Sequence, residues 1–195
     1  MATRRLLLPL AAVALALAGC SGGDEDADPV EGTGYTYSLP DGWEDFSDPA
    51  EEEIEIGGFR PDTLVVGERE DDFSTNVNVI REDGLPNGVT AAQYADASLA
   101  GLRDPVGAGM PPEVAQAIDE ANLRQISEPR DAELDGEEAF AWDYRGTQDG
   151  RDVRVQQVAA VMDGAGYTLT LTVLPDRFDE GTEALDQVIE SWSWK

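Results

Sequence analysis

The only thiol of this 195-residue chain is that of Cys20, at the end of the segment Leu17-Ala18-Gly19-Cys20. A thiol can form a disulfide, act as a nucleophile, bind a metal or carry a lipid. One cysteine cannot form an internal disulfide, and the absence of histidine excludes Cys-His and Ser-His nucleophile pairs and the usual zinc sites. Lipid attachment and burial in a core remain as roles for Cys20.

The residues before Cys20 favour lipid attachment over burial. Arg4 and Arg5 precede an apolar run, residues 6–18, that is too short to span a bilayer, and small residues follow it. This pattern resembles bacterial lipoprotein signal peptides, whose lipobox is lipidated at the cysteine and cut just before it. We therefore predict that residues 1–19 are a signal peptide and that Cys20 is the lipidation site.

A lipidated Cys20 makes the lipid bilayer the first expected partner. Each buried methylene contributes about 0.8 kcal/mol, and two or three acyl chains together make a stable anchor. The predicted location is the extracytoplasmic face of the cell membrane. The segment Thr3-Arg4-Arg5-Leu6 also weakly resembles a twin-arginine signal, but basic pairs are common in ordinary secretion signals.

Carboxylates are the other groups that could do chemistry, since the chain holds 41 acidic residues. The enzymatic alternative that remains is a carboxylate-based hydrolase, in which two carboxylates act as a pair, as they do in glycosidases. Acidic neighbours such as residues 51–53 and 137–138 are typical of solvated surfaces, and the only lysine is the terminal Lys195. No P-loop and no G-x-G-x-x-G between a strand and a helix occurs. We expect no enzyme, no cofactor and no metal site.

The net charge of −28 limits the partners further. Nucleic-acid binding is not expected, because phosphate contacts need Lys and Arg, and the chain has only 13 of these. Abundant Ala, Gly and Asp with a single lysine are typical of a high-GC genome such as an actinobacterial one. Acidity of this kind argues for solubility and repulsion and says little about fold.

Residues 20–34 are predicted to be a disordered acidic tether, because they are rich in Gly and acid and lack apolar periodicity. A calcium loop through Asp24, Asp26 and Asp28 is the alternative, but the Gly and distal Glu of an EF-hand are missing. The rest of the chain, 35–195, fits one domain with a single core.

The first half of this domain predicts strands followed by a helix. Apolar alternation indicates strands from Tyr35, over 63–68 and over 73–81, with a weaker one at Ile54, Ile56 and Phe59. Trp43 and Phe46 are interpreted as a cover for the core, with a ligand-binding aromatic pair as the alternative. A capping box of Thr90 and Gln93 begins a helix over 91–103. Its apolar stripe comprises Ala91, Tyr94, Ala95, Leu99 and Leu102.

The stretch from Asp104 to Arg124 is predicted to be a Gly/Pro loop followed by a short helix over 113–124. If one segment of the domain moves or contacts a partner, we expect it to be this one. The alternative is an ordinary surface loop.

The second half predicts an antiparallel meander and a closing helix. Residues 125–134 are expected to be extended, Asp135-Gly136 signals a hairpin, and Phe140, Trp142 and Tyr144 alternate along the next strand. A change of apolar parity in 153–162 suggests a bulge near Gln156 and Gln157. The alternation over 167–173 is the clearest in the chain and predicts a central strand. An amphipathic C-terminal helix is indicated by Leu185, Val188, Ile189 and Trp192.

The order of these features resembles that of a known family. The string Tyr37-Ser38-Leu39-Pro40-Asp41-Gly42-Trp43 is similar to the Y-x-x-P-x-G-W opening of PsbP/Mog1-like domains, including actinobacterial LpqN/LpqT-type lipoproteins. The Thr90 helix, the hairpin at Asp135-Gly136 and the segment Gly166-Tyr167-Thr168-Leu169-Thr170 follow in the family's order. The resemblance covers residues 35–194. It implies an α+β fold, a mostly antiparallel sheet of about six strands with helices on both faces.

The resemblance implies binding rather than catalysis. Such domains are mostly binding or assembly modules, with partners ranging from photosystem II to a small GTPase, and no binding residue of theirs transfers to this chain. The preferred prediction is a membrane-anchored envelope module that binds another envelope protein or a small ligand. The alternative is a passive or stress-related acidic surface protein.

Overall fold

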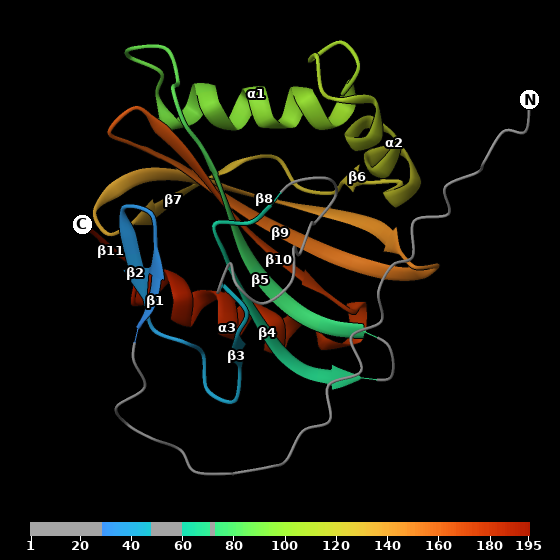
Figure 1. Ribbon diagram of the computed structural model, residues 1–195. Helices are drawn as coiled ribbons and strands as arrows, with labels where there is room; N and C mark the ends of the chain where they lie inside the picture. Colours follow the sequence, from blue (N-terminus) through green and yellow to red (C-terminus); the bar gives the residue numbers. More distant parts are fainter. Residues whose placement is uncertain (1–28, 48–59, 71–72) are drawn as a thin grey trace, which may run out of the picture.

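The centre of the fold is a large antiparallel sheet (Figure 1). It is seen in a computed structural model that describes residues 29–47, 60–70 and 73–195. Adjacent strands follow the order β3-β4-β5-β10-β9-β8-β6, and β7 also pairs with β8. The strands are β3 Glu44–Asp45, β4 Thr63–Glu70, β5 Phe73–Glu82, β6 Arg124–Gln125, β7 Arg130–Leu134, β8 Glu137–Gln148, β9 Arg151–Met162 and β10 Ala165–Val173.

The α+β class and the antiparallel pairing are confirmed, but the strand number is not. This sheet has eight strands where about six were expected. The difference arises from very short strands: β3 and β6 have two residues each. A two-residue strand is too short to show apolar alternation and forms only because a longer strand offers it free backbone groups.

Helices cover both faces of the sheet, as predicted. One face packs against α3 Phe178–Glu190, whose Leu185 and Val188 share a core with Leu169. The other packs against α1 Ala91–Arg103, whose Tyr94 and Leu99 share a core with Trp142 of β8. Figure 1 shows α1 on one side of the sheet and α3 on the other. The central strands are therefore buried on both faces.

Burial on both faces explains why the predicted bulge in β9 is wrong. The register of β9 is continuous against β8 and against β10, past Gln156 and Gln157. Val155 faces the α1 core and Val158 faces the α3 core. The apolar residues change parity along β9 because both faces of this strand are apolar, and no extra residue is inserted.

A second, three-stranded sheet joins the two ends of the described chain. Its order is β1 Val30–Gly32, β2 Tyr35–Tyr37 and β11 Ser193–Trp194. The expectation of a disordered tether through residue 34 is therefore wrong for its last residues. Val30 is only 1% exposed, because β1 pairs with β2 and places this side chain in the core. Ordered structure begins before Tyr35.

The helix of residues 91–103 forms with the predicted capping box. The Thr90 hydroxyl accepts a hydrogen bond from the Gln93 backbone N–H at 3.2 Å, and Gln93 Oε1 accepts one from the Thr90 N–H at 3.1 Å. The short helix beyond it is α2 Pro112–Ala121. It ends at Asn122, whose left-handed backbone (φ 46°) turns the chain into β6. This turn brings β6 to the edge of β8.

Several sequence predictions lie outside the described residues. They are the signal peptide, the lipidation site Cys20, the alternative calcium loop at Asp24, Asp26 and Asp28, and the weak strand at Ile54, Ile56 and Phe59. They remain predictions.

Candidate functional site

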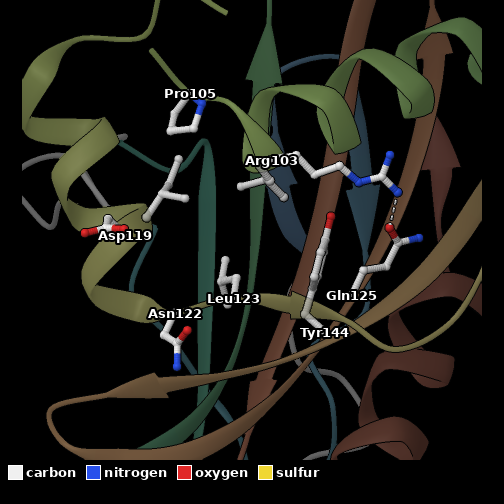
Figure 2. A pocket seen from close by; sticks show the side chains of 9 residues that line it. Arg103, Pro105, Asp119, Asn122, Leu123, Gln125 and Tyr144 are labelled. Atoms are coloured by element: carbon white, nitrogen blue, oxygen red, sulfur yellow. Dashed lines mark hydrogen bonds between the residues drawn. The ribbon is translucent and has the colours of Figure 1, made fainter. Parts of the chain in front are cut away.

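A cavity of about 390 Å³ lies between the end of α1, helix α2 and strands β6 and β8 (Figure 2). Several of its lining residues belong to residues 104–124, the segment predicted to move or to contact a partner. Its lining combines aliphatic, aromatic and charged side chains: Leu102, Arg103, Pro105, Ile118, Asp119, Asn122, Leu123, Gln125 and Tyr144.

Gly146 allows the α2 to β6 connection to lie close against β8. A Cβ atom at Gly146 would stand 2.6 Å from Leu123 Cδ2 and 2.7 Å from the Ala121 carbonyl oxygen. Any larger residue would push Leu123 and the end of α2 away. The glycine thus sets the width of the cavity.

Strand pairing places the polar groups of the cavity together. Gln125 of β6 is the register partner of Tyr144 of β8, so their side chains stand on the same face of the sheet. The last turn of α1 brings Arg103 over them, and Arg103 Nη2 donates a hydrogen bond to Gln125 Oε1 (Figure 2). Gln125 Nε2 in turn donates to the Ser127 carbonyl at 2.7 Å. The amide of Gln125 is held at both ends.

The hydroxyl of Tyr144 is buried and has no hydrogen-bond partner among the described residues. The side chain is 3% exposed, and the neighbouring indole N–H of Trp142 donates to Gln157 Oε1 at 3.1 Å. Burial raises the pKa of Tyr144 to about 12. The nearby Trp142 side chain and the charge of Arg103 lower this pKa, but burial outweighs them. The phenol is therefore a protonated, unused donor at neutral pH.

The cavity carries opposite charges at its two ends. In Figure 2, Tyr144 points toward the end of α1 that bears Arg103, while the carboxylate of Asp119 lies on the far side, on α2. Leu123 lies between them (Figure 2), and Ile118 also lines the cavity. A bound molecule would meet donors and positive charge at one end, aliphatic walls in the middle and negative charge at the other end.

Exposed apolar side chains flank this site. Val106, 76% exposed, lies in the α1 to α2 loop beside Pro105, and Ile126, 42% exposed, directly follows Gln125. They are the exposed large hydrophobic residues of the part of the chain that the structure describes. Each of them adds exposed apolar surface next to a residue that lines the cavity.

The core beside Trp43, the other position considered for ligand binding, is filled with aromatic side chains. Tyr35 and Tyr37 are 0% and 1% exposed, and Trp192 stacks on Tyr35 with ring centroids 4.1 Å apart. Trp43 packs against this core and over Gly67, where a Cβ atom would stand 3.0 Å from its ring. This supports the interpretation of Trp43 as a core cover over a ligand-binding aromatic.

The cavity has a single carboxylate in its lining. Asp119 is the only carboxylate that lines the cavity, so no glycosidase-like pair faces it. Within residues 29–47, 60–70 and 73–195, no cluster of three metal-ligating side chains occurs. In those same ranges no helix is long and apolar enough to cross a membrane.

We predict that Tyr144→Phe raises the free energy of unfolding by about 1 kcal/mol, because it removes a buried hydroxyl that has no partner. The matched control is Tyr94→Phe. The Tyr94 hydroxyl is also buried but is hydrogen-bonded to Thr168 Oγ1 at 3.2 Å, so its loss should lower stability by about 1 kcal/mol. Urea unfolding of both variants measures the difference. Equal losses in the two would show that the Tyr144 hydroxyl is already satisfied.

Comparison with known proteins identifies the fold. No model of a known family matches the sequence, and no curated protein matches it. The solution structure of CyanoP, the cyanobacterial PsbP of Synechocystis sp. PCC 6803, matches with a TM-score of 0.56 and 22% identity, over 91% of this chain and 99% of that one.

A second match is LpqN of Mycobacterium tuberculosis, a protein involved in cell envelope biogenesis. Its crystal structure matches with a TM-score of 0.55 and 14% identity, over 85% of this chain and 88% of that one. At these identities the likeness is one of fold. The chain therefore has the PsbP-like fold that the order of its motifs predicted, shared with LpqN.

Proposed function

We propose that this chain is a lipid-anchored protein on the extracytoplasmic face of a bacterial membrane and acts as a non-catalytic binding module of the cell envelope. Its binding site is the cavity between α1, α2, β6 and β8. The observation that carries the proposal is the coincidence of this cavity with the exposed Val106 and Ile126. The fold shared with an envelope protein, LpqN, supports the setting.

The arrangement of the fold suits an anchored binding module. The described chain enters the fold at β1, which in Figure 1 lies at the opposite end of the molecule from α2 and β6. A tether from Cys20 would reach the domain at β1. The cavity would then face away from the membrane, toward molecules in the envelope.

Site-specific photo-crosslinking in the native cells tests the binding role. A benzophenone side chain placed at Val106 is expected to give one dominant, saturable adduct, because this position borders the cavity and is 76% exposed. The control places the same side chain at Glu133, an exposed position on β7 away from the cavity. Equal labelling from both positions, or no saturable adduct at Val106, would contradict the proposal and favour a passive surface protein.

A further inference from the structure

Arg103 carries a positive charge that no carboxylate neutralises in the described structure. The chain has 41 acidic and 13 basic residues, and the described arginines Arg81, Arg130 and Arg177 form ion pairs. Others, such as Arg124 with the Asn122 amide, bond to neutral groups. Arg103 likewise donates to the neutral amide of Gln125. In a chain so rich in acid, this leaves a guanidinium available to an anion at the cavity.

A second donor lies at the same end of the cavity. The Tyr144 hydroxyl is buried without a partner, and Figure 2 shows it pointing toward the end of α1 that carries Arg103. A buried donor left unpaired is unfavourable, and a bound acceptor would remove that penalty. A guanidinium and a phenol together suit a carboxylate, which accepts hydrogen bonds on both oxygens.

The remainder of the cavity suits an apolar body of limited size. Leu102, Ile118 and Leu123 supply aliphatic wall. The volume of about 390 Å³ lies at the small end of the range of small-molecule pockets, roughly 300–1,000 Å³. Asp119 at the far end would repel a second anionic group.

We infer that this cavity binds a small monocarboxylate with an apolar body, the carboxylate held by Arg103 and the Tyr144 hydroxyl. The inference rests on the proposed function, since it takes the same cavity as the binding site. Gln125 Oε1 occupies the acceptor position on Arg103 in this structure, and the carboxylate takes its place. The overall charge of −28 does not prevent this, because charges beyond a Debye length of about 8 Å are screened at physiological salt.

The test uses three probes that share one body: 4-phenylbutanoate, the neutral 4-phenylbutan-1-ol, and 4-(4-carboxyphenyl)butanoate, which carries a second carboxylate. Each is titrated by calorimetry into the full-length protein in phospholipid nanodiscs, with empty nanodiscs as the blank. The monocarboxylate is expected to bind once per chain, about tenfold tighter than the alcohol, because its carboxylate brings a negative charge and two acceptor oxygens to Arg103. It should also bind more tightly than the dicarboxylate. Equal affinity for the acid and the alcohol would overturn the inference.

Variants locate the binding. Arg103→Gln should reduce the affinity for 4-phenylbutanoate about tenfold and leave that for the alcohol unchanged. Arg124→Gln is the matched control, since Arg124 is an exposed arginine of β6 that does not line the cavity. An unchanged affinity in Arg103→Gln would mean that the acid binds elsewhere.

The outcomes separate this inference from the proposed function. If the alcohol binds as tightly as the acid, or if no probe binds while the Val106 crosslink forms, the cavity region is a binding site for another class of partner and only the inference fails. If no probe binds and no saturable crosslink forms at Val106, both fail.

Discussion

Replacing Cys20 with Ala is expected to abolish lipidation and release the protein from the membrane. The prediction follows from the lipobox-like segment Leu17-Ala18-Gly19-Cys20, because no other thiol exists to receive an acyl group. At about 0.8 kcal/mol per buried methylene, two or three acyl chains account for nearly all of the membrane affinity. Metabolic labelling with an alkyne fatty acid followed by detergent-phase partitioning measures both effects. The wild-type protein should carry the label and enter the detergent phase.

The control for this experiment is Ser21→Ala, which changes the neighbouring residue and leaves the thiol in place. It should keep both the label and the detergent-phase partitioning. Labelling must be scored together with partitioning, because an uncut signal peptide retains the apolar run of residues 6–18. Fatty-acid label on the Cys20→Ala protein would show that the anchor assignment is wrong.

The sequence predicts best those elements whose residues carry local information. The alternation of Tyr167, Leu169 and Leu171 predicted a central strand, and β10 lies between β5 and β9. The capping box at Thr90 marked the start of α1, because both of its hydrogen bonds join residues three apart. Such features form through neighbouring residues, so their signal is complete within a short window.

Very short strands were missed. β1 and β11 are three and two residues long, and they form because β2 lies between them. The backbone N–H of Lys195 donates to the Gly34 carbonyl at 3.0 Å, joining the two ends of the described chain. Three residues are too few for β1 to show periodicity, although its partner β2 follows after a two-residue turn. The partner of β11 lies far along the chain, so nothing within residues 193–194 indicates that pairing.

The candidate site is hidden in the sequence for the same reason. Arg103 ends a helix, Gln125 lies in a two-residue strand, and Tyr144 is one of several alternating aromatic residues on a long strand. The pairing of β6 with β8 brings Gln125 and Tyr144 together, and the packing of α1 on the sheet adds Arg103. The sequence indicates the site only through a missing pattern. Residues 104–124 have little apolar periodicity, which is typical of segments that form surface sites.

The second large effect is expected for Trp192→Ala, which should lower the free energy of unfolding by about 3–5 kcal/mol. Trp192 is 3% exposed, and its indole stacks on Tyr35 with centroids 4.1 Å apart and rings inclined by 9°. It also packs edge-on against Trp194, at 5.3 Å. Truncation would leave a cavity between α3 and the small sheet that joins the chain ends. The midpoint of thermal unfolding, measured by circular dichroism, should fall by about 10 °C or more.

Two further variants show whether ring packing is the cause. Trp192→Phe should lose much less stability, because phenylalanine keeps an aromatic ring on Tyr35 and the Trp192 N–H has no partner to lose among the described residues. Trp194→Ala removes an indole of equal size that is only partly buried, together with its hydrogen bond to the Leu134 carbonyl at 2.9 Å. Its loss should lie between those of the two Trp192 variants, since less apolar area returns to water. If Trp194→Ala lowered the free energy of unfolding most, the contacts of Trp194, rather than the stacking of Trp192 on Tyr35, would be the main stabilising interaction of the small sheet.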